Sequence, residues 1–516
     1  MVLNMLDRST APGSEFGDRT TVLREDEREA VRQLLMQMSA DQIMAGDTKR
    51  QQLLTSLGAN RELLRRSYDD PTLRGDLLYA LHALAGSRSI NEHDDLGSQL
   101  CASALAFEEE LAPDMEECAG RNELDWFHAS RCFVDLARSE DESQQKLGTT
   151  TLARNQRYIE SGLQCAGEWH DSYDALGAML ARGEGVVVDQ AETLITKALT
   201  QSNDATRVGK LYALFFDRAA SNYVHDRGRE LVTIELTRHG LPAESVLRAW
   251  RQSGGNMAAV VEESIARLCA LDAAHEGAAK ALYEEFNIAE FGRYPIELLI
   301  RQYEERDGKE RTYGVLIYPR VDDPVGPLQR EWPALSSLDE QVRDELPLRV
   351  IEYASGPDLL RQIKRLEERY GSCCVFGYLA GHGRREGVNT GGPDRRRYFI
   401  QRDDIEPLPW RPWNGAARVK RNEVITALRS VFVSEPTVVL GACATGKDGG
   451  FGQSLSRTTG GTVLAPEANN MGVKDFHAVR ERDSGWRFDV DYKHSYDYQS
   501  CGTVRYVNGK KVTVPA

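Results

Sequence analysis

A chain of 516 residues is longer than one ordinary domain and indicates about two to four domains. Its 64 basic and 79 acidic residues give a net charge of −15. This charge argues against strong direct nucleic-acid binding, which requires a positive field around the phosphates. With 41% hydrophobic and 28% charged residues the chain has the balance of a globular protein, and no apolar run approaches the roughly 18–20 residues of a membrane span.

The start of the chain and its cysteines bear on the compartment. Residues 1–24 lack a basic start followed by an apolar stretch, so we expect a flexible leader there and no secretory signal. The nine cysteines are scattered from Cys101 to Cys501 and form neither a CxxC pair nor a zinc-finger pattern. We therefore expect reduced thiols, a cytoplasmic location, no membrane association, and no metal ion or organic cofactor.

Residues 25–305 have the periodicity of helices, with apolar residues three and four positions apart and few strand signals. The stretch 173–199 looks like one helix pair of a tetratricopeptide-type solenoid, with small residues at Ala175, Gly177 and Ala178 where helices would approach closely. A second copy does not align. An irregular helical bundle therefore remains the alternative to a solenoid.

The pattern changes to alternating strands and helices from residue 306 onward. Compact apolar runs suited to buried strands occur at 312–319, 348–355, 372–381, 436–443 and 461–466. Helices are predicted between them, one after Ser355 and Pro357 and ending at Gly371, and another beginning at Asn422. This alternation predicts a doubly wound, mostly parallel α/β sheet, so the chain combines an all-α N-terminal region with a C-terminal α/β domain at 306–516.

Residues 470–516 differ again and are expected to form a β-rich C-terminal extension. The segment 503–514 alternates around Asn508-Gly509, which is typical of a type I′ hairpin.

Two predicted strands end in residues that suit nucleophilic catalysis. The third runs into His382 and Gly383, and the fourth runs into Cys443. If these strands are parallel neighbours, the imidazole and the thiol extend from the same edge of the sheet. A thiolate is a strong nucleophile, and a nearby histidine can accept the thiol proton and return it to a leaving amine. The backbone N–H groups of Gly383 and Cys443 are the candidate oxyanion donors.

The same residues carry a family resemblance. Tyr-Leu-Ala-Gly-His-Gly at 378–383, followed by Val-Val-Leu-Gly-Ala-Cys-Ala-Thr-Gly at 438–446, resembles the caspase-like cysteine peptidases and is most similar to their CHAT domain. The resemblance covers roughly residues 310–470. The family more often has Ser-Ala-Cys-Glu where this chain has Gly-Ala-Cys-Ala at 441–444, a difference that gives no reason to expect loss of catalysis.

The resemblance implies a caspase-like fold and a cysteine endopeptidase that uses His382 and Cys443 as a dyad to cleave a specific protein. CHAT domains with helical N-terminal regions are similar to bacterial immune proteases, some encoded beside gasdermins and others attached to RNA-guided complexes. By this analogy residues 25–305 would bind an activating protein or an RNA-guided complex. The protease would then release a toxic effector in antiphage defence.

Other residues have competing interpretations. Cys373 and Cys374, at the start of the third strand, are expected to be core thiols. His477 and His494 are not favoured as the base. Asp403 and Asp404 could line a pocket for a basic substrate side chain, although surface capping explains them equally well. Basic runs follow His382 and suit either a solvated loop or a loop that binds acidic substrate residues: Arg384, Arg385 and Arg395 to Arg397.

Two non-enzymatic alternatives remain open. The α/β domain could be a catalytically silent scaffold, which would leave the intact His382 and Cys443 unexplained. Alternatively the chain could be a helical-repeat adaptor protein, whose C-terminal hairpin offers a strand edge for pairing.

Overall fold

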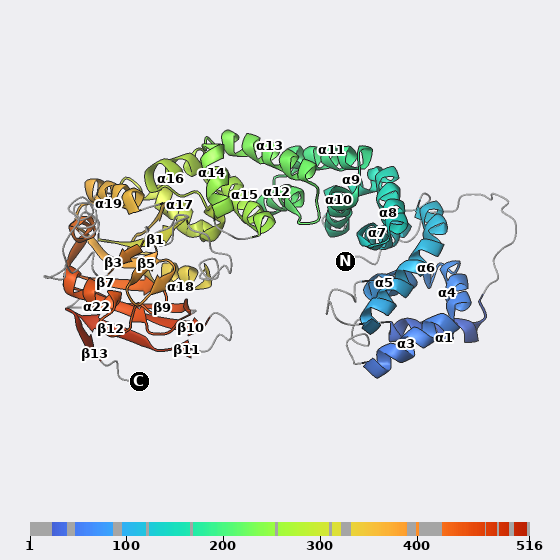
Figure 1. The fold of residues 1–516 in the computed structure, drawn as a ribbon. Coiled ribbons are helices and arrows are strands. Elements are labelled where there is room, and N and C mark those ends of the chain that lie inside the picture. The colour runs from blue at the N-terminus through green and yellow to red at the C-terminus, as the bar shows by residue number, and fades with distance from the viewer. Residues whose placement is uncertain are drawn as a thin grey trace. The chain divides into compact units, whose positions relative to one another are not determined.

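The architecture follows the predicted order along the chain, with a helix-rich N-terminal part before a mostly parallel mixed sheet (Figure 1). The computed structural model describes residues 23–38, 47–85, 95–119, 123–165, 169–252, 256–308, 312–320, 332–354, 356–389, 399–401, 426–469, 471–481, 485–494 and 500–512. The chain packs as two compact units, Met1–Ala198 and Leu199–Ala516. The predicted division at 305/306 falls inside the second unit and stays a prediction.

The described residues of the first unit form helices joined by short turns. Its helices are α1 (Glu25–Gln37), α3 (Asp47–Ala59), α4 (Arg61–Tyr68), α5 (Arg74–Ala85), α6 (Asp95–Ala119), α7 (Glu123–Arg138), α8 (Glu142–Arg154), α9 (Gln156–Gln164), α10 (Trp169–Arg182) and most of α11 (Val186–Gln201).

Local chemistry explains where these helices begin and how they pack. The Asp141 side chain accepts hydrogen bonds from the N–H groups of Ser143 and Gln144, which satisfies free donors at the start of α8. Gly148 lets α8 lie against α7, because a Cβ at this position would come 2.4 Å from the backbone nitrogen of Ala137. The helix pair expected at 173–199 forms α10 and α11, whereas the solenoid itself stays a prediction.

The second unit begins with further helices and continues into the sheet. These helices are α12 (Ala205–Ala213), η2 (Leu214–Phe216), α13 (Asn222–Arg238), α14 (Ala243–Gln252), α15 (Met257–Ala274), α16 (Ala278–Phe286), η3 (Phe291–Arg293) and α17 (Ile296–Glu304). Between and beside the strands lie α18 (Trp332–Val342), α19 (Gly356–Tyr370) and α22 (Phe451–Thr459), and residues 426–431 are also helical.

A seven-stranded sheet forms the centre of the second unit, in the order β13-β12-β8-β7-β3-β1-β2. Its strands are β1 (Tyr313–Pro319), β2 (Leu348–Tyr353), β3 (Cys374–Ala380), β7 (Phe432–Gly441), β8 (Thr462–Pro466), β12 (Thr503–Val507) and β13 (Lys510–Val512). The strands β2, β1, β3, β7 and β8 are parallel, and β12 and β13 continue the sheet in antiparallel pairs. All five predicted apolar runs are therefore strands of one sheet.

Smaller sheets accompany the central one. One consists of β4 (Gly383–Arg384), β5 (Gly387–Asn389) and β6 (Phe399–Gln401), and another of β9 (Met471–Glu481), β10 (Gly485–His494) and β11 (Ser500–Cys501). The β9–β10 layer packs on β3 through aromatic side chains. The ring centroids of Phe376 and Phe488 lie 4.3 Å apart, and those of Tyr378 and Phe476 lie 5.4 Å apart.

Two strand edges are covered by glutamine side chains. Gln302 of α17 donates to the carbonyl of Val350 in β2 and accepts from its N–H, both at 2.9 Å. Gln341 of α18 similarly bonds to the backbone of β9. It donates to Phe476 O at 2.8 Å and accepts from Ala478 N at 2.7 Å. Each primary amide thus satisfies backbone groups that would otherwise be open on an edge strand.

The predicted type I′ hairpin is confirmed at β12–β13. Asn508 and Gly509 have φ angles of 49° and 76°, in the left-handed region that this turn requires at both central positions.

Within the described ranges, no helix combines the length and the apolar character that crossing a membrane requires.

Candidate active site

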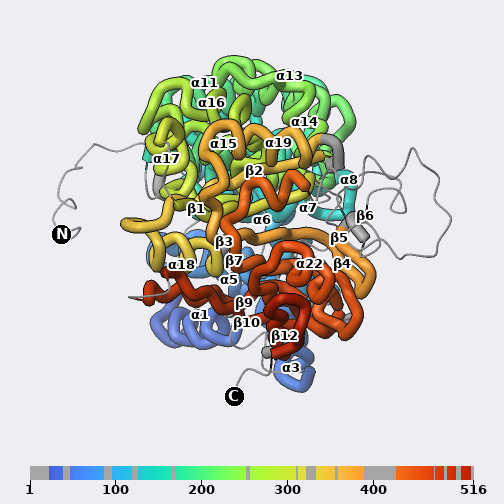
Figure 2. The backbone as a smooth tube through the Cα atoms, turned by 90° about the vertical axis from the view of Figure 1, so that its left-hand side faces the viewer, coloured from blue at the N-terminus to red at the C-terminus, as the bar shows by residue number. Residues whose placement is uncertain are grey.

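His382 and Cys443 follow adjacent parallel strands at matching positions. Strands β3 and β7 lie side by side (Figure 2). Ala380 of β3 is aligned with Gly441 of β7, and the N–H of Gly381 donates to Gly441 O at 3.2 Å. His382 and Cys443 each lie two residues beyond this aligned pair. The condition set by the sequence, that the two strands be parallel neighbours, is met.

The backbone after His382 lies directly against the backbone that carries Cys443. A Cβ on Gly383 would come 2.7 Å from the carbonyl carbon and the Cβ of Ala442, and 2.7 Å from the nitrogen of Cys443. Real side chains do not tolerate such distances, so this contact requires glycine. The two backbone N–H groups considered as oxyanion donors belong to the residues that meet here.

The turn after Cys443 is held by the last residue of β8 and by the segment that follows it. Ala444 has a φ of 58°, and its N–H donates to Ala468 O at 2.8 Å. The N–H of Gly446 donates to Pro466 O, also at 2.8 Å. A non-glycine residue in the left-handed region costs of order 1 kcal/mol or more and is concentrated at functional sites. The turn after Cys443 therefore has a strained backbone.

Cys443 is half-buried, and its sulfur lies beside the first residue of β9. Met471 N donates to Sγ at 3.4 Å, and Sγ lies 3.8 Å from Met471 O.

The loops after His382 and Cys443 are also joined to each other. The guanidinium of Arg385 donates to Asp448 O at 2.6 and 3.1 Å, and the N–H of Phe451 donates to Arg385 O at 2.8 Å. Arg385 therefore has a structural role in this loop. Arg384 is exposed.

The remaining candidates are two cysteines, two histidines and several residues outside the described part of the chain. Cys374 is buried in β3, and burial raises the pKa of its thiol, as expected for a core cysteine. His477 is exposed on β9 and pairs with Asp491 at 3.1 Å, and His494 ends β10. The expectation of a core thiol is not met for Cys373, which is half-buried just before β3. Candidates outside the described residues are Asp403, Asp404 and Arg395 to Arg397.

Two tyrosines from the C-terminal strands support the site, and the sequence analysis did not identify them. Tyr492 of β10 donates its hydroxyl to Leu440 O at 2.9 Å, at the end of β7. Tyr506 of β12 donates to Gly446 O at 2.9 Å, in the turn after Cys443. Both occupy buried positions in alternating strands, a weak signal that does not reveal which turn they reach.

Comparison with protein-family models, with curated proteins and with solved structures gave no match. The interpretation of the site therefore depends on its geometry and on the motif resemblance.

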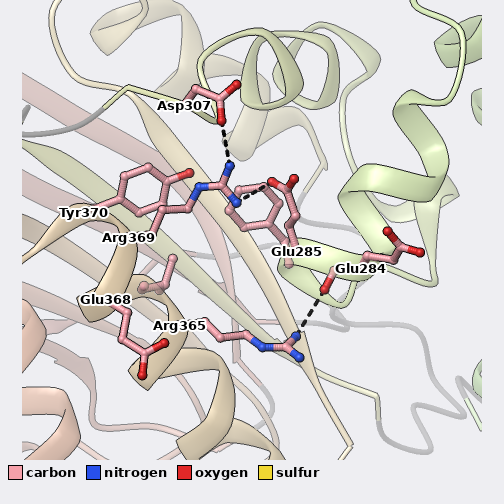
Figure 3. A pocket seen from close by; sticks show the side chains of 9 residues that line it. Glu284, Glu285, Asp307, Arg365, Glu368, Arg369 and Tyr370 are labelled. Atoms are coloured by element: carbon pink, nitrogen blue, oxygen red, sulfur yellow. Dashed lines mark hydrogen bonds and ion pairs between the residues drawn. The ribbon is translucent and has the colours of Figure 1, made fainter.

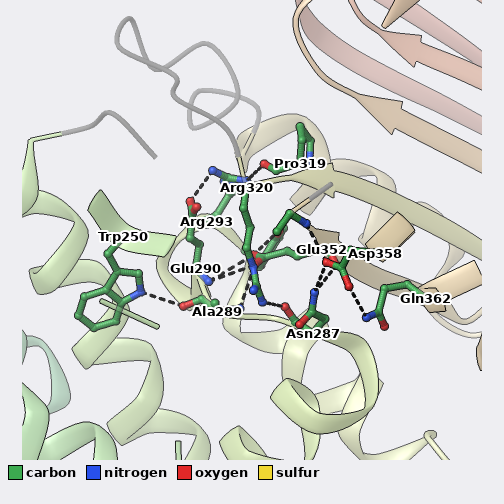
Figure 4. A network of polar contacts seen from close by, with 12 residues as sticks. Trp250, Asn287, Ala289, Glu290, Arg293, Pro319, Arg320, Glu352, Asp358 and Gln362 are labelled. Atoms are coloured by element: carbon green, nitrogen blue, oxygen red, sulfur yellow. Dashed lines mark hydrogen bonds and ion pairs between the residues drawn. The ribbon is translucent and has the colours of Figure 1, made fainter. Parts of the chain in front are cut away.

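A buried polar network lies at the ends of β1 and β2 (Figure 4). The carboxylate of Glu352 accepts from Ala289 N at 2.9 Å, from Tyr294 OH at 2.8 Å and from Arg320 Nε at 3.0 Å. Asn287 donates to Glu352 O at 2.9 Å. Since β1, β2, β3 and β7 are parallel, this network lies at the carboxyl ends of the strands, where His382 and Cys443 also lie. It connects residues 287–294, which lie between α16 and α17, to that end of the sheet.

A cavity of about 580 Å³ lies between α16 and α19 (Figure 3). The two arginines of its lining are already bonded, and Arg369 contacts Glu285 at 2.7 Å and Asp307 at 3.0 Å. Arg365 donates to Glu284 O at 3.1 Å. Because this end of α19 leads into the start of β3, the cavity belongs to the edge opposite His382, and we assign it no part in the site.

Proposed function

We propose that the chain is a cysteine endopeptidase with a caspase-like α/β domain, in which Cys443 is the nucleophile and His382 the base. The observation that carries the proposal is the matched position of the two residues beyond Ala380 and Gly441. The close approach of Gly383 to Cys443 supports it, as does the motif resemblance.

In this mechanism His382 accepts the thiol proton and Cys443 Sγ attacks the carbonyl carbon of the scissile peptide bond. Negative charge on the carbonyl oxygen is stabilised by the N–H groups of Gly383 and Cys443, each of which would contribute about 3–4 kcal/mol. The C–N bond breaks as His382 protonates the leaving amine. Water, deprotonated by His382, then hydrolyses the thioester and restores the thiol.

We further propose that residues 25–305 bind an activating protein or RNA-guided complex, and that the cleaved protein is an effector of antiphage defence such as a gasdermin. The support for this step is the resemblance to CHAT-domain proteases. No disulfide joins any of the nine cysteines, all of which are described, and this suits a reducing compartment such as the cytoplasm.

The test of the dyad is labelling with a peptide electrophile that alkylates catalytic thiols, read by mass spectrometry. We expect modification of Cys443 to exceed that of the exposed Cys165 and to fall at least tenfold in His382→Ala. His477→Ala is the matched control and should leave labelling unchanged. Equal labelling of Cys443 and Cys165 would contradict the dyad and favour the silent scaffold.

Co-expression with candidate protein substrates tests the activity itself. A discrete fragment formed by the wild type and absent with Cys443→Ala supports the endopeptidase, and its new terminus identifies the cleaved bond.

A further inference from the structure

Four side chains with metal-binding chemistry meet between α13 and α15, in a part of the chain that the proposed mechanism does not use. Glu235 lies in the last turn of α13, and His239 follows it by four residues, directly after the helix. Cys269 and Asp272 lie one turn apart on α15. The side chains of His239 and Glu235 are only 1% and 8% exposed. We call these four residues the α13–α15 cluster.

The spacing of three of these side chains approaches that of a tetrahedral metal site. His239 Nε2 lies 3.1 Å from Glu235 Oε1, Cys269 Sγ lies 4.0 Å from the same oxygen, and all three ligand atoms are within 4.8 Å of one another. Zinc bonds of about 2.0–2.3 Å place ligand atoms roughly 3.3–3.8 Å apart. Side-chain adjustments of about an ångström would therefore bring the three atoms around one ion.

The surrounding contacts orient these ligands. His239 Nδ1 is hydrogen-bonded to Asp272 Oδ2 at 2.5 Å, which leaves Nε2 on the side of Glu235 and Cys269. A carboxylate that holds the second nitrogen of a ligating histidine is the usual support in zinc sites. Tyr212 donates to Glu235 Oε2 at 3.1 Å, so Oε1 is the oxygen that faces the histidine. Asp272 Oδ1 is buried and has no hydrogen-bond partner within the described ranges.

We propose that the α13–α15 cluster binds a zinc ion through His239 Nε2, Cys269 Sγ and Glu235 Oε1, with Asp272 orienting the histidine. An imidazole, a thiolate and a carboxylate together suit Zn²⁺ better than the oxygen-seeking Mg²⁺ or Ca²⁺. Three protein ligands leave the fourth position to water or to a ligand from a partner. The ion would join α13 to α15.

The experiment uses Co²⁺ as a spectroscopic substitute for Zn²⁺ in the full-length Cys443→Ala protein, which removes the thiol of the proposed active site. We expect one Co²⁺ per chain, tetrahedral visible bands, a thiolate-to-cobalt charge-transfer band, and loss of all of these on adding Zn²⁺. Absence of the charge-transfer band at stoichiometric Co²⁺ overturns the proposal, and this outcome can be seen without any further variant.

Matched variants assign the ligands. Cys269→Ser should abolish the charge-transfer band, whereas Cys165→Ser, at an exposed position, should retain it. Asp272→Asn should weaken Zn²⁺ binding about 10- to 100-fold, as is usual for the loss of a residue that supports a ligand. Far-UV circular dichroism checks that each variant is folded. A band that survives in folded Cys269→Ser places the metal elsewhere and contradicts the proposal.

Discussion

Gly383 and Cys443 are in backbone contact, so close that a single Cβ on Gly383 would lie 2.7 Å from the nitrogen of Cys443. This contact joins two loops that are 60 residues apart in the sequence. The first prediction follows from it.

Gly383→Ala should separate the two loops and lower the rate of Cys443 alkylation by at least tenfold, because the candidate oxyanion donors and the dyad would lose their alignment. The matched control is Gly472→Ala in β9, next to Met471, where an added Cβ meets no atom within 4 Å. Rates are measured with the peptide electrophile. Equal rates for Gly383→Ala and the wild type would contradict the assigned contact.

Tyr492→Phe removes a hydroxyl that donates to Leu440 O at 2.9 Å and to Leu464 O at 3.3 Å. We expect the free energy of unfolding to fall by about 1–2 kcal/mol, because the ring remains packed while buried carbonyls lose a donor. Urea denaturation measures the change. Val479→Ala, at an exposed position on the neighbouring strand β9, should change stability by less than about 0.5 kcal/mol.

Glu352→Ala leaves the guanidinium of Arg320 buried without its carboxylate. Breaking one side of a buried ion pair costs about 3–5 kcal/mol, so this variant should unfold at much lower urea concentration than the wild type. Glu345→Ala breaks the exposed pair with Arg480 and should cost less than about 1 kcal/mol. If the two variants lost similar amounts of unfolding free energy, the ion pair of Glu352 and Arg320 would not contribute to stability as predicted.

Glu108→Gln tests a buried carboxyl in α6. In the folded chain, burial and, to a smaller extent, the negative charge of Asp135 raise the pKa of Glu108 well above its ordinary value. Above the unfolded-state pKa the unfolded chain binds fewer protons than the folded one, so stability falls by about 1.4 kcal/mol for each further pH unit, until the folded group also titrates.

The substitution removes this penalty. Glu108→Gln should therefore be more stable than the wild type at pH 8, and the advantage should shrink toward pH 4. Thermal unfolding across this range measures the difference. Glu109→Gln, on the same helix at an exposed position, is the control. An advantage that is independent of pH would contradict a neutral Glu108.

The sheet could be predicted from the sequence because its strands are short continuous apolar runs, a pattern that is typical of strands buried on both faces. The positions of His382 and Cys443 followed from the same reasoning, since parallel strands deliver their ends to one edge. The hairpin at Asn508 and Gly509 was predictable because only a few residues tolerate positive φ.

The supports of the site were not predictable in the same way. Tyr492 and Tyr506 act through hydroxyls that reach backbone carbonyls more than 50 residues away, and no local pattern encodes such a partner. The same holds for Glu352, which the sequence shows only as one of two charged residues, with Arg349, in a strand that is otherwise apolar. The α13–α15 cluster was missed because its ligands come from two helices, with no spacing that resembles a known metal motif.

The amide of Gln302 has a consequence for anyone who dissects the chain. It binds both backbone groups of Val350 and so makes the two hydrogen bonds that a neighbouring strand would make on this side of β2. A fragment that begins after α17, at the boundary suggested by the sequence, would lack Gln302. Its strand β2 would then present unpaired backbone groups that can pair with other copies of the fragment. We expect such a fragment to self-associate, and one that retains α17 to stay monodisperse. The last helix before the sheet is thus part of the smallest piece worth producing.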